Sequence, residues 1–312
     1  MAGLVEVESC DIDQKDYMRN TPLGWAALNG HEEVVRMLLE RDYIDPNKPD
    51  NDGETPLRSA AYNGHEGVVK LLLGRDDVDP NLPDQCLRTP LWGAAYEGHE
   101  GIVELLLGRD DINPDLPNWD NQTPLLWAAY QGHEGVVKLL LGRDDVNPNW
   151  PDNVGHTPLW GAAENEHEGV LKLLLERDDV NLEVLDKLDG TLLWYAARNG
   201  HEGVVRILLA RDDVDPNKPG CQDQTPLWLA ASKGHEGIVK ILLGRHDIEP
   251  DKPDEDGRTP LLRAAENGHE VVVRMLLERD DVDPNKPDNK GRTPLKRATD
   301  NRYPGVISHY NL

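Results

Sequence analysis

The apolar and polar residues of this chain follow a pattern that returns every 34 residues. In the first period, residues 22–28 form a short run rich in leucine and alanine, and residues 32–39 place valine and leucine at the spacing of one helix face. Residues 45–53, rich in proline and aspartate, separate this pair of runs from the next one. The pattern predicts pairs of short helices, each pair followed by an extended loop.

Three residue types mark the period. Threonine recurs at 21, 55, 89, 123, 157, 191, 225, 259 and 293, histidine at 31, 65, 99, 133, 167, 201, 235 and 269, and arginine at 41, 75, 109, 143, 177, 211, 245 and 279. Threonine suits the N-cap of the first helix, and the proline that follows it in all periods but one suits the first helical position. The glycine before most of the histidines suits a left-handed turn that ends the first helix.

In combination, Thr-Pro-Leu-x-x-Ala-Ala, Gly-His, Val-Val-x-Leu-Leu-Leu and a hairpin with Asp52-Gly53 resemble the ankyrin repeat over about residues 10–303. The tetratricopeptide repeat has the same period, but its Trp, Leu-Gly and Tyr pattern is absent from this sequence. The connection Arg-Asp-Asp-Val-Asp-Pro-Asn, as at Arg75–Asn81, is similar to ankyrin arrays of filamentous fungi that are attached to NLR-type NTPase sensors.

The resemblance implies an all-α fold, an ankyrin-repeat solenoid of stacked helix-turn-helix units with hairpin fingers. We expect nine 34-residue repeats. Residues 1–20 would form an N-terminal cap, residues 21–292 eight full repeats, and residues 293–312 a C-terminal capping repeat. Altered terminal repeats shield the ends of a solenoid.

The net charge of the chain indicates which classes of partner it can bind. It carries 58 acidic and 33 Lys or Arg residues, a net charge of −25, so its surface repels nucleic acids and anionic membranes and favours basic or mixed protein partners. Its three cysteines, at 10, 86 and 221, are too scattered for a disulfide framework and indicate a reducing compartment, the cytoplasm or alternatively the nucleus. The sequence has no signal peptide pattern and no apolar run of about 18 residues. We expect a monomer.

The histidines that recur every 34 residues, which we call the histidine ladder, and the recurring Arg-Asp-Asp segments, the arginine ladder, could in principle bind metal ions. Neighbouring helices pack about 8–10 Å apart, whereas zinc needs nitrogen ligands at about 2.0–2.1 Å, so the histidines are expected to hydrogen-bond backbone between repeats. The arginines and aspartates are expected to form a solvated charge network across repeats, with a calcium site as the alternative. No nucleophile elbow or phosphate-binding loop occurs in the sequence. We therefore expect no metal, no cofactor and no enzymatic activity.

The variable positions of each repeat predict the functional surface. In ankyrin folds the concave face is built from the finger tips and the exposed side of the first helix. The residues predicted to bind a partner in this groove are Tyr62, Trp92, Tyr96, Trp119, Tyr130, Trp160, Glu164, Trp194 and Arg198. For Trp160, Trp194 and Trp228 the alternative is packing between helices, and Trp25 and Trp127 are expected in the core.

These observations predict a protein-interaction scaffold that holds a protein or peptide partner in its concave groove. The alternative is a spacer or self-associating sensor segment of a larger signalling protein. One junction is irregular, because Glu166 replaces glycine and leucines 182, 185 and 192 replace prolines. We expect a reshaped finger there and the weakest contact between repeats, with faster amide exchange over residues 160–195.

Overall fold

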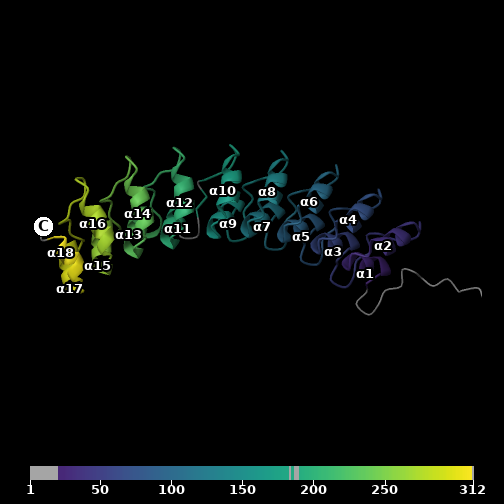
Figure 1. Cartoon of the computed structure of the whole chain (residues 1–312), viewed down its shortest axis with the longest axis horizontal. Coiled ribbons are helices and arrows are strands. Elements are labelled where there is room, and N and C mark those ends of the chain that lie inside the picture. The colour runs from purple at the N-terminus through teal and green to yellow at the C-terminus, as the bar shows by residue number, and fades with distance from the viewer. Residues whose placement is uncertain (1–19, 183, 186–189, 311–312) are drawn as a thin grey trace, which may run out of the picture. The chain divides into compact units, whose positions relative to one another are not determined.

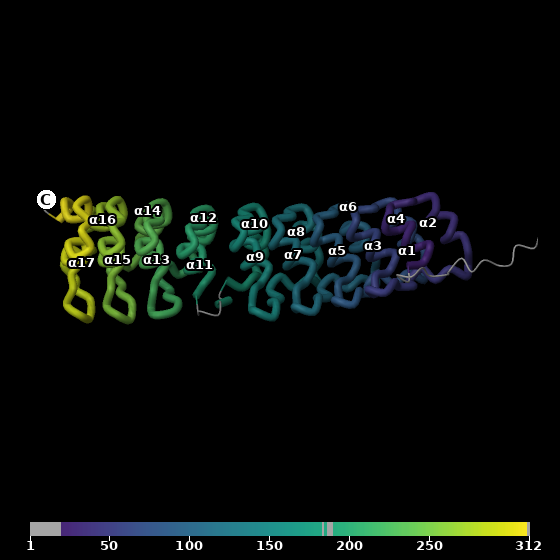
Figure 2. Tube along the Cα trace, turned by 90° about the horizontal axis from the view of Figure 1, so that it is seen from below, coloured from purple at the N-terminus to yellow at the C-terminus, as the bar shows by residue number. Residues whose placement is uncertain are grey.

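The computed structural model describes residues 20–182, 184–185 and 190–310. The chain divides into two compact units. One comprises Met1–Asn153 with Thr157–Gly161, and the other comprises Val154–His156 with Ala162–Leu312. Within each unit, pairs of short helices follow one another in chain order, and the first and second helices of the pairs form two layers (Figures 1 and 2).

Unit one is built from α1 (Pro22–Leu28), α2 (Glu32–Leu39), α3 (Pro56–Tyr62), α4 (Glu66–Leu73), α5 (Pro90–Glu97), α6 (Glu100–Leu107), α7 (Pro124–Gln131) and α8 (Glu134–Leu141). The division between the units falls inside α9 (Pro158–Glu164). Unit two continues with α10 (Glu168–Leu175), α11 (Leu192–Asn199), α12 (Glu202–Leu209), the 3-10 turn η1 (Cys221–Asp223), α13 (Pro226–Lys233), α14 (Glu236–Leu243), α15 (Pro260–Asn267), α16 (Glu270–Leu277), α17 (Pro294–Asp300) and α18 (Pro304–Ser308).

The ends of the helices form as the sequence predicts. The Thr55 hydroxyl accepts a hydrogen bond from the backbone N–H of Arg58, and Pro56 occupies the first helical position of α3. At the C-terminal end of α5, Gly98 has φ +79° and ends the helix in the left-handed conformation. Because no strand occurs among the described residues, the all-α class of repeated helix pairs is confirmed.

Alanine, leucine and valine side chains fill the space between the helix layers. Ala94, Ala95 and Val103 are fully buried, and the same positions are buried in the other complete helix pairs. Small, uniform aliphatic residues suit thin repeated layers, since each pair packs only on its neighbours. None of the described helices combines the length and the apolar character needed to cross a lipid bilayer.

The connections between pairs form hairpin fingers. In one finger the N–H of Asp84 donates to the carbonyl of Arg88, and in the next Asn118 donates to Gln122 in the same way. Adjacent fingers are also joined, because the N–H of Trp119 donates to the carbonyl of Cys86 at 3.2 Å. The fingers of unit one are therefore held in a hydrogen-bonded row.

The histidine ladder joins consecutive helix pairs. The Nε2 atom of His99 lies 3.1 Å from the carbonyl oxygen of Tyr62, and His133 lies 3.0 Å from that of Tyr96. The predicted backbone role of these histidines is confirmed. The ring of His99 also lies against Gly64, where any Cβ would stand 2.8 Å from a ring carbon. A glycine at this position thus serves both the left-handed turn and the close approach of the histidine.

The arginine ladder combines ion pairs within each repeat with contacts to the preceding repeat. Arg109 donates two hydrogen bonds to the carboxylate of Asp111 in its own repeat, at 2.9 and 2.7 Å. Its link to the preceding repeat is a hydrogen bond to the carbonyl of Leu73. The ion pairs are therefore local, and backbone carbonyls at the ends of the second helices carry the connection between repeats. Asp111 through its hydrogen bonds and Asp76 of the preceding repeat through its charge both raise the pKa of Arg109, so the expected charge interactions across repeats are present beside the local ion pairs.

At the irregular junction, the structure shows one direct consequence of the sequence change. Glu166 adopts φ +57°, which glycine adopts at the equivalent positions, and its carboxylate lies 3.1 Å from Nδ1 of His201. The finger that was expected to change shape includes residues 183 and 186–189, which lie outside the described residues. The weak junction therefore stays a prediction.

Candidate functional site: an aromatic face on unit one

Five aromatic side chains from three consecutive first helices meet in unit one. They are Tyr62 of α3, Trp92 and Tyr96 of α5, and Trp127 and Tyr130 of α7, and we call this group the aromatic face. The array is continuous, because each ring contacts the next at centroid distances from 4.9 to 6.4 Å. Four of the five residues are partly buried, and Trp92 lies beneath them.

The array contains stacked contacts among Tyr62, Trp92 and Tyr96 and edge-to-face contacts around Trp127. The rings of Tyr62 and Tyr96 are nearly parallel, with centroids 6.4 Å apart and an interplanar angle of 19°. Trp127 meets Tyr96 edge to face at 4.9 Å and 62°. Offset stacks and T-shaped pairs are the favoured geometries of aromatic rings, and each pair adds about 0.5–1.5 kcal/mol beyond area burial. The face is thus preorganised before any ligand binds.

Two glycines inside the first helices make room for the tyrosines. A Cβ at Gly93 of α5 would stand 3.4 Å from Cβ of Tyr62, and one at Gly161 of α9 would stand 3.4 Å from Cα of Tyr130. Both distances are ordinary van der Waals contacts, so each glycine lies directly against the tyrosine of the preceding helix.

Gln122 ties a finger to the aromatic face. Its carbonyl accepts a hydrogen bond from Nε1 of Trp92 at 3.2 Å, and its side-chain oxygen accepts one from Nε1 of Trp127 at 2.9 Å. The same finger carries Trp119, whose side chain is 64% exposed. The two indole N–H groups therefore fix the base of the finger that presents Trp119 to solvent.

A buried ion pair lies under one edge of the face. Arg58 pairs with Glu54 at 2.7 Å and with Asp84 at 3.1 Å, and its guanidinium lies 4.9 Å from the centroid of the Tyr62 ring. Arg88 also pairs with Asp84 and lies over the ring of Trp92. Both cations are thus neutralised by carboxylates of the fingers and hold the aromatic rings from below.

The exposed charges on the same side are acidic. Glu97 follows Tyr96 at the end of α5, and through a side-chain hydrogen bond it raises the pKa of the Tyr62 hydroxyl. The finger residues Asp52 and Asp120 are exposed as well. In the described part of the chain, no cationic side chain forms an ion pair with any of these three carboxylates. The face therefore offers negative charge beside aromatic rings.

Three of the other predicted site residues, Glu164, Trp194 and Arg198, belong to unit two. Glu164 accepts a hydrogen bond from the Tyr195 hydroxyl at 3.2 Å, and Arg198 is exposed, with its guanidinium 5.4 Å from the centroid of the Trp194 ring. Trp160 lies in α9 on the unit-one side of the division. The structure brings together the aromatic residues of unit one and, separately, the polar residues of unit two.

Burial corrects part of the predicted site. Trp92, Trp160 and Trp194 are only 4%, 3% and 1% exposed, so they pack inside and cannot offer direct contact surface. The physical reason is visible at Trp92 and Trp194, whose indole N–H groups donate to the backbone of the following finger. The first helix turns this position toward the finger, so the alternative of packing between elements holds there.

The expected core positions of two other tryptophans are also wrong. Trp25 is 48% exposed, and Trp127 is partly buried on the aromatic face. Trp127 precedes Tyr130 by three residues, a spacing that places two side chains on the same side of a helix. This spacing in the sequence could have identified Trp127 as part of the surface.

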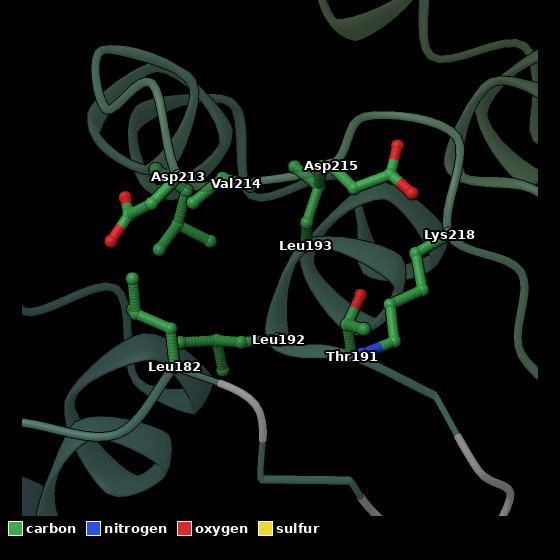
Figure 3. A pocket seen from close by; sticks show the side chains of 9 residues that line it. Leu182, Thr191, Leu192, Leu193, Asp213, Val214, Asp215 and Lys218 are labelled. Atoms are coloured by element: carbon green, nitrogen blue, oxygen red, sulfur yellow. The ribbon is translucent and has the colours of Figure 1, made fainter.

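Among the described residues, unit two contains a cavity of very small volume. Figure 3 shows this cavity, enclosed by Leu182, Leu192 and Val214, with Asp213, Asp215 and Lys218 around it. Its volume of about 30 Å³ accommodates one or two water molecules. Within the described ranges, no group of three or more His, Cys, Asp or Glu side chains is placed to hold a metal ion.

The second helices present shallow hollows on another surface. One of them, with a volume of about 740 Å³, lies between α6 and α8 and has Gly101, Gly108 and Gly135 in its lining. Glu104 on one helix and Lys138 on the other give it both signs of charge. This surface is open and balanced in charge, so it lacks the chemical character of the aromatic face.

Comparison with known families finds one match. A family model described as "Ankyrin repeats (3 copies)" matches residues 3–84, 44–118, 74–152, 91–184, 179–254 and 247–308. A comparison with curated proteins finds no match to this sequence. The matched segments together extend over nearly the whole chain, including all the residues of the aromatic face.

Proposed function

This chain belongs to the ankyrin repeat family, whose repeats are generally protein–protein interaction modules, and from this premise we propose that it binds a protein or peptide partner through the aromatic face. The face and the fingers that carry Leu87 and Trp119 would form the central part of the groove. The exposed side chains that make contact are Tyr62, Tyr96, Trp127 and Tyr130 with Trp119. The buried Trp92 would position them.

The concentration of aromatic residues on this face carries the proposal. Only 5% of the chain is aromatic and it contains no phenylalanine, yet five rings from three helices form one continuous, partly exposed array. Rigid aromatic side chains are typical anchors of protein interfaces because little rotamer entropy is lost when they are covered. Packing alone does not require the tyrosines and Trp127, since the equivalent positions of unit two include Arg198, Ser232 and Leu229.

A pull-down with two matched variants tests the proposal. The triple variant Tyr62→Ala/Tyr96→Ala/Tyr130→Ala should recover much less of a partner, identified by mass spectrometry, than the wild-type chain does. The control is Tyr43→Ala, which removes a tyrosine that is 61% exposed and lies outside the face. Far-UV circular dichroism must show that both variants keep the helical fold. Equal recovery by the wild type and a folded triple variant would exclude the aromatic face as the binding surface.

The sequence also indicates the kind of protein and the cellular compartment in which the chain acts. The similarity of Arg75–Asn81 to fungal sensor-associated arrays supports a role as the recognition segment of a larger signalling protein, for which a spacer or self-associating element is the alternative. A spacer has no use for an exposed aromatic array, so the same pull-down separates the two. The scattered cysteines support a reducing compartment, the cytoplasm or alternatively the nucleus, and the acidic surface disfavours a nucleic-acid partner.

A further inference from the structure

We infer that the aromatic face contains a receptor site for an arginine side chain of the partner, formed by Tyr62, Tyr96 and Glu97. This inference rests on the proposed function, because it names the chemistry of the ligand that the same surface would take. The partner would present the arginine on an extended basic segment that crosses α3 and α5.

The geometry provides both parts of such a site. Tyr62 and Tyr96 are nearly parallel and partly exposed, and the exposed carboxylate of Glu97 follows Tyr96 directly. Because Arg58 already lies over Tyr62 and Trp92 is stacked on Tyr96, an added guanidinium would contact the ring surface that stays exposed. A guanidinium is planar, so it can lie on a ring while its N–H groups donate in pairs to a carboxylate. A lysine ammonium can reach the same carboxylate but cannot stack as a plane, so arginine is the better ligand.

In unit two, arginines at the positions equivalent to Tyr96 and Trp127 place their guanidinium groups over aromatic rings. Arg198 stands three periods after Tyr96, and its guanidinium lies 5.4 Å from the Trp194 ring centroid. Arg263 stands four periods after Trp127 and lies 4.9 Å from the centroid of Trp228. At these two positions unit one has Tyr96 and Trp127 in place of arginine. Its own Arg58 and Arg88 lie over Tyr62 and Trp92.

The charges of unit one favour a cation from outside. Arg58 and Arg88, the cations next to the face, already pair with Glu54 and Asp84. Glu97 has no cationic partner within the described chain, and Asp52 and Asp120 add exposed negative charge on the fingers. A partner arginine would therefore meet an uncompensated carboxylate and an attractive field, while a nucleic acid would be repelled.

Titration of the full chain with three blocked peptides tests the site. The peptides share one Gly-Ser sequence and carry arginine, lysine or the neutral isostere citrulline at the centre. Binding is followed by the chemical shifts of the tyrosine and indole side chains. We expect the arginine peptide to bind about tenfold more tightly than the citrulline peptide and more tightly than the lysine peptide. Equal affinities for arginine and citrulline, or no binding of any peptide up to millimolar concentration, would overturn the inference.

Two glutamate variants test whether Glu97 causes the preference for arginine. Glu97→Gln should abolish most of the preference for arginine over citrulline, whereas Glu104→Gln, the same change on an exposed residue of α6, should leave it intact. Equal preference in wild type and Glu97→Gln would remove Glu97 from the site. If a natural partner is lost by the triple tyrosine variant but kept by Glu97→Gln, the proposed function stands and the arginine site falls. If both variants keep it, the proposed function falls as well.

Discussion

Nε2 of His99 lies 3.1 Å from the carbonyl oxygen of Tyr62, so the residue that opens the aromatic face is fixed by the histidine ladder. The contact spans two helix pairs, because Tyr62 ends α3 and His99 precedes α6. The ring of Tyr62 then stacks on Tyr96, whose own carbonyl accepts the next histidine, His133. The ladder that joins the repeats thus also sets the spacing of the tyrosines.

Replacing one ladder histidine should weaken one junction. His99→Ala leaves the Tyr62 carbonyl without this partner, and the loss of a partly buried hydrogen bond costs about 0.5–1.5 kcal/mol. We expect a lower free energy of unfolding by about that amount, measured by urea denaturation. His246→Ala is the control, since His246 is exposed and lies outside the ladder. EDTA should change neither protein, and a loss of helical circular dichroism in EDTA would favour a metal role for the histidines.

Asp115 occupies a position at which the neighbouring repeats have asparagine, which can both donate and accept a hydrogen bond. The amide of Asn81 donates to the carbonyl of Asp111 at 2.7 Å, and the same residue accepts from the backbone of the next repeat. Asp115 still accepts from the N–H of Asn147, but its Oδ1 has no partner, and burial raises its pKa. Asp115→Asn should therefore stabilise the fold at pH 7 by about 0.5–1.5 kcal/mol.

The pH dependence of this gain has a defined sign. Because the folded-state pKa of Asp115 is raised, its contribution to stability is present below the unfolded pKa of about 4 and is lost as the pH rises through the folded pKa. The advantage of Asp115→Asn should thus shrink as the pH falls through the raised folded-state pKa toward about 4, and it should stay small below that pH. Asp52→Asn, on an exposed finger, is the matched control and should show no comparable gain. An unchanged unfolding midpoint for Asp115→Asn at pH 7 would contradict this interpretation.

The local Arg–Asp pairs predict the opposite pH dependence. Arg109 lowers the pKa of Asp111 through its paired hydrogen bonds, so this stabilisation is present above the unfolded pKa and is lost as the pH falls through the lower folded pKa. Asp111→Asn should cost about 0.2–1 kcal/mol at pH 7, the range of an exposed ion pair, and the deficit should disappear toward pH 2. Asp110→Asn is the control, because Arg109 makes no hydrogen bond to Asp110 in the described contacts. A deficit that persists at pH 2 would show that charge pairing is not its cause.

The 34-residue period of the sequence predicted much of the fold, but it could not show how deeply each side chain is buried. Thr55, Gly98 and His99 act at positions where their chemistry is specific, so their roles were visible from spacing alone. Trp92 and Trp127 are different, because a large aromatic residue can pack inside or cover a surface at the same spacing. Only the structure shows that Trp92 turns toward a finger, while Trp127 covers the outer side of Tyr96.

Titration of one hydroxyl tests the contact at the arginine site. Glu97 raises the pKa of Tyr62, mainly because the ionised tyrosine would lose its hydrogen bond to the carboxylate and be repelled by it. Glu97→Gln should therefore move the pKa of Tyr62 down toward the ordinary tyrosine value of about 10. Ultraviolet titration at the phenolate band, compared with Tyr62→Phe to assign the transition, measures this shift. An identical titration curve in wild type and Glu97→Gln would mean that the two side chains do not interact in solution.

Site-specific photo-crosslinking tests the central claim, that a partner covers the aromatic face of unit one. A benzophenone amino acid would replace Tyr96 in one version of the chain and Met37, which is 63% exposed on α2, in another. The account predicts that the partner recovered by the wild-type chain becomes covalently joined at position 96 and not at position 37. Crosslinking at position 37 with none at position 96, in a variant that still binds the partner, would contradict it.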